Sequence, residues 1–102
     1  MIVDEFQHIV YENPDMTPSE RDAVYLELEK KYRPYLSFDG IPYLEEGTRW
    51  QYQMHIYETP FYYIDYCLAQ VVALEFLELS EKNYDEALKR YLEHCKRGGL
   101  YP

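Results

Sequence analysis

The sequence is poor in positive charge and in cysteine, and it lacks the alternating pattern of strands. Its 102 residues include 10 Lys and Arg against 19 Asp and Glu, which gives a net charge of −9. With no block of basic residues, this balance argues against binding to nucleic-acid phosphates or to an anionic membrane surface. No stretch alternates apolar and polar residues as a half-buried strand does, and no segment repeats. The remaining candidates are helical proteins that act on or bind other molecules.

Cysteine is almost absent, which limits both disulfide and metal chemistry. Cys67 and Cys95 are the only two, and they lie 28 residues apart. His94 directly precedes Cys95, but adjacent helical residues point about 100° apart, so this pair is a poor chelate. The sequence shows no signal-peptide pattern. We therefore expect a cytoplasmic protein with two reduced, buried thiols, and a single disulfide is the alternative.

The longest apolar segment is interrupted too often to cross a membrane. Phe61 to Leu79 is long enough for a span, but each charged residue in it would be costly in lipid. The pattern instead predicts a helix over residues 60–82 whose first half is apolar on nearly every side. A helix of this kind is typically buried inside a protein. The interrupting residues are Asp65, Gln70, Glu75 and Glu78.

Apolar residues recur with the helical period along most of the chain, so the predicted fold class is all-α with four to five helices. A short first helix ends at Asn13-Pro14. A second begins at Thr17-Pro18-Ser19-Glu20, which combines a capping box with proline at the first helical position, and it ends at Arg33-Pro34. Residues 34–43 are predicted to form a loop.

Two further helices are predicted beyond this loop. Leu44 to Tyr57 is expected to form a shorter helix, although Gly47 weakens it. The last helix begins at Asn83, which can cap it, and stops at Gly98-Gly99. Its apolar residues line one face.

Tyrosine is the abundant residue, with 13 in the chain. A buried tyrosine hydroxyl needs a hydrogen-bond partner, so this number predicts either a tyrosine-rich surface or a polar cleft lined by aromatic rings. Some tyrosines follow the apolar stripes of the predicted helices, and we expect these to serve packing. They are Tyr25, Tyr32, Tyr84 and Tyr91.

The densest aromatic cluster follows His55 across a junction broken by Pro60, and it includes Tyr62, Tyr63 and Tyr66. Tyr63 and Tyr66 are three residues apart, which places them one turn apart on the same helical face. Neutral phenol hydroxyls, like His55, can donate hydrogen bonds to a carbonyl oxygen or a developing oxyanion. An aromatic core cluster with satisfied hydroxyls explains the same residues, and their spacing does not separate the two interpretations.

The segment Asp4-Glu5-Phe6-Gln7-His8 approaches the zinc motif H-E-x-x-H, with Asp in place of the first His. Asp4 and His8 lie at ligand spacing on one helical face, but no third ligand follows at a suitable distance along the chain. We therefore expect no metal site here, and His8 is predicted to be a packed or surface histidine.

Much of the sequence resembles the oligoendopeptidase F group of zinc metallopeptidases, within the thimet oligopeptidase-like superfamily. The matching stretches are Phe6 to Pro14, Thr17 to Arg21, Trp50 to His55, Pro60 to Tyr66 with Leu68-Ala69-Gln70, and Lys82 to Gly99. The string from His55 to Tyr66 is the most specific part of the resemblance.

The resemblance implies a largely helical, cytoplasmic enzyme that cleaves short peptides in a deep channel. One zinc ion, held by H-E-x-x-H and a downstream Glu, would supply the attacking water. The resemblance also implies that His55 and Tyr66, and then Tyr63, hydrogen-bond the substrate carbonyl and its tetrahedral intermediate. Tyr62 is expected to bind substrate.

The sequence departs from the family pattern because it contains no H-E-x-x-H. We therefore expect residues 1–102 to form a single all-helical segment from the C-terminal part of a larger catalytic domain, without a cofactor of its own and inactive alone. Whether this chain is itself an enzyme stays open. Expected partners are an oligopeptide substrate in the intact enzyme, and either the missing N-terminal part or a second copy of this chain. The alternative function is a stand-alone, self-associating helical interaction module. Leu100-Tyr101-Pro102 differs from the usual family tail.

Overall fold

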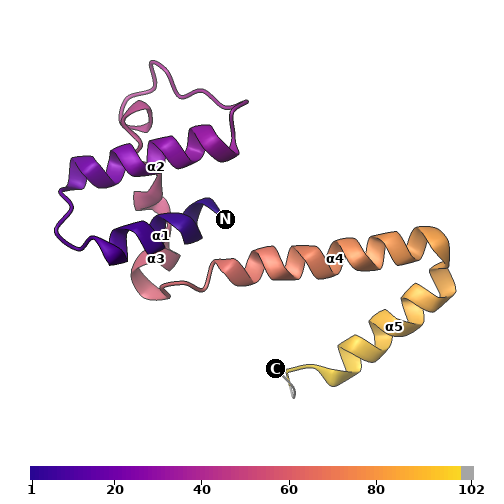
Figure 1. Ribbon diagram of the computed structural model, residues 1–102. Coiled ribbons are helices and arrows are strands. Elements are labelled where there is room, and N and C mark those ends of the chain that lie inside the picture. Colours follow the sequence, from indigo (N-terminus) through magenta and orange to yellow (C-terminus); the bar gives the residue numbers. More distant parts are fainter. Residues whose placement is uncertain (100–102) are drawn as a thin grey trace. The chain divides into compact units, whose positions relative to one another are not determined.

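The computed structural model describes residues 1–99, and these form helices and turns without a β-strand (Figure 1). The predicted all-α fold with four to five helices is confirmed. The elements are α1 (Ile2–Glu12), α2 (Pro18–Tyr32), the 3₁₀ helices η1 (Leu44–Glu46) and η2 (Thr48–Tyr52), α3 (Met54–Glu58), α4 (Ile64–Lys82) and α5 (Tyr84–Arg97). The tail Leu100-Tyr101-Pro102 lies outside the described residues.

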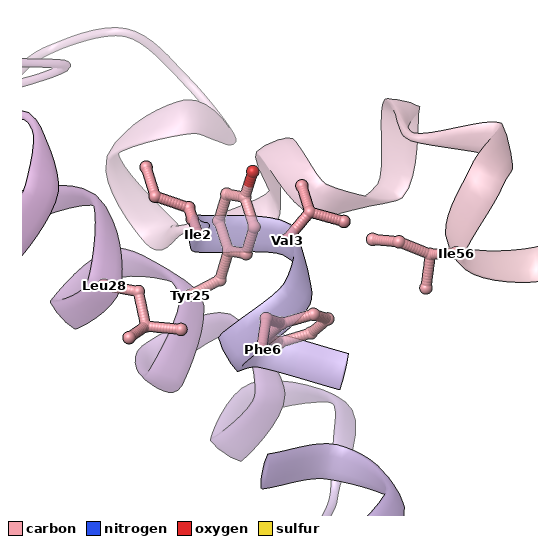
Figure 2. Packing of buried hydrophobic residues seen from close by; sticks show 6 residues of the cluster. All are labelled: Ile2, Val3, Phe6, Tyr25, Leu28 and Ile56. Carbon is pink, nitrogen blue, oxygen red and sulfur yellow. The ribbon is translucent and has the colours of Figure 1, made fainter. Parts of the chain in front are cut away.

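The chain divides into two compact units, Met1–Asp65 and Tyr66–Pro102, and each is described by itself. In the first unit, α1 packs against α2, and their apolar faces enclose a small core (Figure 2). Phe6 is 1% exposed, and its ring meets those of Tyr25 and Trp50 with centroids 5.2 Å apart in both cases. The buried apolar residues of this cluster are Ile2, Val3, Phe6, Tyr25, Leu28 and Ile56.

Helix α2 begins where its capping sequence predicts. The Glu20 backbone N–H donates to Thr17 Oγ1 at 3.3 Å, and the Thr17 backbone N–H donates to Glu20 Oε2 at 2.7 Å. These hydrogen bonds satisfy donors that a helix start leaves without partners. The Thr17 backbone N–H and hydroxyl both donate to the Glu20 carboxylate, and these two hydrogen bonds hold its pKa below the usual value. Pro18 occupies the first turn, and the helix ends at Tyr32, before Arg33-Pro34.

The predicted helix from Leu44 to Tyr57 is instead three short pieces, η1, η2 and α3. The break lies at Gly47, whose φ of +88° falls in the left-handed region. A Cβ on Gly47 would lie 2.2 Å from the backbone oxygen of Asp22. Glycine therefore permits both the break and the close approach of this segment to α2.

In the second unit, α4 forms a helix as predicted, but the expected burial is wrong: none of its residues is buried. Leu68 and Val71, for example, are 59% and 54% exposed. Helix α5 begins at Asn83, whose side chain accepts from the Glu86 backbone N–H at 3.1 Å. No helix within residues 1–99 has the length and apolar character needed to cross a membrane.

The second unit also corrects the expected burial of both cysteines. Each carries a thiol rather than a disulfide, but Cys67 is only partly buried and Cys95 is exposed. The exposure of α4 and of both cysteines has one cause: the second unit consists of two helices, which enclose little interior. Of the tyrosines assigned to packing, Tyr84 is exposed for this reason, whereas Tyr25 is fully buried in the first unit. Tyr91 is half exposed and packs its ring edge-on against Phe76.

Candidate functional site

His55 lies in the first turn of α3 and collects two of the predicted tyrosines around its imidazole ring. The Tyr62 ring is parallel to it, with centroids 6.5 Å apart. The Tyr63 ring meets it edge-on at 5.0 Å, with the two planes at 88°. The structure therefore brings His55, Tyr62 and Tyr63 together, as the sequence pattern predicts.

A hollow of about 270 Å³ lies beside this cluster and is lined by Met54, His55, Glu58, Thr59 and Tyr62. An imidazole, a phenol and a carboxylate thus share one open surface. The first two can donate hydrogen bonds to a peptide carbonyl while neutral, and the carboxylate accepts hydrogen bonds from peptide N–H groups. This combination suits the recognition of a polypeptide backbone.

The junction between α3 and α4 is held in place by Gln7, which is 1% exposed on α1. The Phe61 backbone N–H donates to Gln7 Oε1 at 2.8 Å, and Gln7 Nε2 donates to the Val3 carbonyl oxygen at 3.2 Å. Phe61 itself has a φ of +63°, a region that non-glycine residues rarely occupy. The buried Gln7 amide therefore stabilises an unusual backbone conformation one residue before Tyr62.

Tyr63 differs from Tyr62 in its surroundings. Its hydroxyl donates to Gln53 Oε1 at 3.0 Å, and its side chain lines a separate hollow together with Tyr25 and Tyr32. Tyr63 immediately precedes Ile64, the first residue of α4, so it stands at the start of the helix, and a shared face with Tyr66 stays a prediction. The backbone at Tyr63 forms a turn, and the helix begins at the next residue.

Tyr66 lies on α4 in the second unit, where it is 51% exposed. Its role beside His55 stays a prediction.

Sequence reasoning missed three residues of this region, Glu58, Thr59 and Gln53. The first two lie between His55 and Tyr62, so they necessarily turn with the chain at this junction. The Thr59 backbone N–H donates to the His55 carbonyl oxygen at 3.0 Å, which closes α3 beside the imidazole. Glu58 and Thr59 could have been found from the sequence, because they lie between His55 and Tyr62. Gln53 could be found only from its contact with Tyr63.

Within residues 1–99, no group of three or more His, Cys, Asp or Glu side chains is arranged to hold a metal ion. Asp4 and His8 are 3.9 Å apart at their nearest polar atoms, and the His8 side chain is 60% exposed. The His8 ring packs against Phe61 with centroids 4.9 Å apart. His8 is thus a surface histidine that contacts an aromatic ring. The described residues do not fit a zinc site of the family type.

Two solved structures match almost the whole chain. One, of PZ peptidase A with an inhibitor, is 53% identical with a TM-score of 0.89, and the match covers 99% of this chain and 18% of that chain. The other is an X-ray structure named as an oligoendopeptidase F, which is 50% identical, with the same TM-score and the same coverage of both chains. The chain is related to oligoendopeptidase F. No family model and no curated protein matches the sequence.

The likeness to these oligoendopeptidase F structures confirms the resemblance found in the sequence and is consistent with a C-terminal segment. The chain spans only about a fifth of the length of each matched chain. The all-helical fold described above therefore corresponds to one part of a peptidase.

Proposed function

We propose that the chain is the substrate-binding part of a zinc-dependent oligoendopeptidase that hydrolyses short peptides in the cytoplasm. The observation that carries this proposal is the match of nearly the entire chain, at 50% identity or more, to two peptidase structures. In this role, His55, Tyr63 and Tyr66 donate hydrogen bonds to the scissile carbonyl and its tetrahedral intermediate, and Tyr63 does so by exchanging the hydrogen bond that its hydroxyl donates to Gln53 Oε1. Tyr62 contacts the peptide beside them.

The geometry around His55 supports this role. The imidazole and the Tyr62 ring line the same open hollow, so both can be reached by an extended peptide. The Tyr63 ring braces the imidazole from its edge. Donors that are held in place before the reaction stabilise a developing oxyanion more than water does, and loss of one such donor typically lowers kcat about 10²–10³-fold.

The described residues do not hold a metal ion, so no step of the proposal uses a metal bound to this chain. Hydrogen-bond donors stabilise an intermediate but do not generate a nucleophile. The nucleophile must therefore come from another part of the peptidase fold, which in the family carries zinc and H-E-x-x-H. We expect the chain alone to be inactive.

A fluorogenic oligopeptide assay tests the proposal. The chain is assayed alone, with added zinc, and mixed with a separate polypeptide that supplies H-E-x-x-H and the remaining family fold. We expect hydrolysis only in the mixture, with kcat about 10²–10³-fold lower for Tyr66→Phe. Tyr84→Phe is the matched control, because Tyr84 is also exposed, at 65% against 51% for Tyr66, but lies in α5, outside the proposed site.

Two outcomes would contradict this proposal. Zinc-dependent hydrolysis by the isolated chain that Tyr66→Phe abolishes would show that the chain needs no other part. Restored hydrolysis that neither Tyr66→Phe nor His55→Ala changes would remove the proposed donors from the mechanism.

The exposed apolar side chains of α4 favour a second candidate function, a self-associating helical interaction module. Contiguous exposed apolar residues mark interaction surfaces in many soluble proteins. Sedimentation separates the candidates, since a folded chain that stays monomeric at high concentration argues against the module. The side chains concerned are Leu68, Val71, Val72, Leu74 and Leu77.

A further inference from the structure

The first unit contains a second hollow, of about 300 Å³, that the proposed peptidase role does not use. It lies between α1 and the η2–α3 segment, and its apolar walls include Phe6, Val10, Trp50 and Ile56. Its volume is at the lower end of the range for small-molecule sites, which are mostly apolar with a few polar groups.

Arg21 is the polar side chain in this hollow that lacks a full set of partners. Its Nε is buried and has no hydrogen-bond acceptor, while one terminal nitrogen donates to the Pro14 carbonyl oxygen at 3.2 Å. Among residues 1–99, Arg21 forms no ion pair, although acidic residues outnumber basic ones almost two to one in the chain. A buried guanidinium donor without an acceptor is unfavourable.

Two of the other polar side chains around this hollow, Gln7 and Trp50, are already engaged. Gln7 bonds to Phe61 and Val3 through both ends of its amide. The Trp50 indole N–H donates to Asp22 Oδ1 at 2.7 Å, so Trp50 offers its ring to the hollow and not its donor. The hollow therefore combines an apolar, aromatic wall with one cationic donor, Arg21, and with the side chains of Tyr11 and Tyr57.

We propose that this hollow binds a carboxylate attached to a small aromatic or apolar group. The carboxylate accepts a charge-assisted hydrogen bond from Arg21, and the apolar group packs on Phe6 and Trp50. Both a free aryl-alkanoic acid and the C-terminal aromatic residue of a peptide carry this chemistry. The site is separate from the His55 hollow, so its occupancy does not depend on the peptidase role.

Fluorescence of the full chain reports binding directly, because Trp50 is the only tryptophan. The probes are 3-phenylpropionate and its neutral amide, which have nearly the same size. We expect both to change the Trp50 emission, with the acid binding about tenfold more tightly or better, as an ionic hydrogen bond requires. Equal affinities, or no change in emission at millimolar acid, would overturn the proposal.

Arg21→Met removes the charge and should bring the affinity for the acid down to that for the amide. Arg90→Met is the control, because Arg90 pairs with Glu86 on α5, and it should keep the full preference. Val10→Phe fills the hollow and should abolish binding of both probes while leaving Arg21 in place. Circular dichroism confirms that each variant is folded. Retention of the acid preference in folded Arg21→Met contradicts the proposal, and the wild-type comparison stands even if that variant unfolds.

The source of the carboxylate is distinguished by a third probe, Gly-Gly-Phe, together with its C-terminal amide. Tighter binding of the tripeptide than of 3-phenylpropionate supports a peptide end as the ligand, and the reverse order supports a free acid. In either case the amide must bind more weakly than its acid. A tripeptide and an amide of equal affinity count against the site.

Discussion

Helix α2, which carries many charges, buries Tyr25, Leu28 and Glu29, whereas the more apolar helix α4 buries none of its residues. The first unit gives α2 several facing elements: α1 and the 3₁₀ helices η1 and η2 on either side of Gly47. Even Glu29 is buried there: its Oε1 pairs with Arg49 at 3.0 Å, although its Oε2 is buried without a hydrogen-bond partner. The comparison teaches that burial is decided by the surfaces a helix meets and not by its own hydrophobicity.

The largest expected effect comes from truncating the core of the first unit. Phe6→Ala removes a ring that is 1% exposed and contacts two other aromatic rings, so it should lower the free energy of unfolding by about 3–5 kcal/mol. Leu68→Ala on α4 should change it by less than about 0.5 kcal/mol, because Leu68 is 59% exposed. Urea unfolding followed by Trp50 fluorescence and by circular dichroism measures both.

A large loss for Leu68→Ala would break the comparison, since it would show that α4 is buried in solution. Self-association is the route by which this could happen. The measurement is therefore repeated at several protein concentrations, and only a concentration-independent result for Leu68→Ala supports an exposed helix.

A smaller effect is expected at the polar contact that fixes the α3–α4 junction. Gln7→Leu puts an apolar side chain of similar size at this position and leaves the Phe61 N–H without its acceptor. We expect this to lower the free energy of unfolding by about 1–3 kcal/mol. It should also weaken peptide binding near Tyr62. Gln51→Leu is the matched control, because Gln51 is exposed and its hydrogen bond to Asp22 is long, at 3.5 Å. Equal unfolding midpoints for the two variants would remove Gln7 from the junction.

The start of α2 and the cap of α5 could be predicted because each depends on a few neighbouring residues. Thr17 and Glu20 satisfy each other within one turn, and Asn83 needs only Glu86. The break at Gly47 could not be predicted with the same confidence from its residue type alone. Gly47 has a left-handed φ, and a side chain there would collide with the backbone of α2. The second of these depends on residues that are far apart in the sequence.

The candidate site shows the same division between local and distant information. The aromatic string after His55 predicted either a cleft or an aromatic cluster containing Tyr62 and Tyr63, and both rings lie against the imidazole, since all three residues lie within nine positions. The hollow beside Arg21 is lined by residues of α1, α2 and the η2–α3 segment, which are far apart in the sequence. No spacing along the chain therefore predicts it. Burial of α4 was overestimated because its hydrophobic pattern does not specify what covers it.

The two helix caps extend the comparison to equal chemistry in unequal surroundings. Thr17→Ala and Asn83→Ala each remove a side-chain acceptor from a helix start and should each destabilise their helix by about 1 kcal/mol. In α2, the loss should lower the unfolding midpoint seen by Trp50, because α2 packs on the core. In α5, it should lower the helical circular dichroism signal without moving that midpoint. A midpoint shift of the same size in both variants would mean that the two units unfold together.

The smallest effect concerns the pH dependence of the Glu5 contact between α1 and α2. Lys31 lies 2.8 Å from the Glu5 carboxylate and Tyr32 donates to it, so these hydrogen bonds lower the pKa of Glu5 below its usual 4.5. A lowered pKa in the folded state means that the contact stabilises the fold above pH 4.5 and that this contribution is lost as the pH falls through the folded value. Glu5→Gln should therefore flatten the acid side of the stability profile. Glu86→Gln is the control, because the pKa of Glu86 is also lowered, by Arg90, but within the single helix α5. The stability of wild type and Glu5→Gln is compared as the pH falls, with unfolding followed by Trp50. Parallel profiles would show that the Glu5 contact between α1 and α2 makes no pH-dependent contribution to stability.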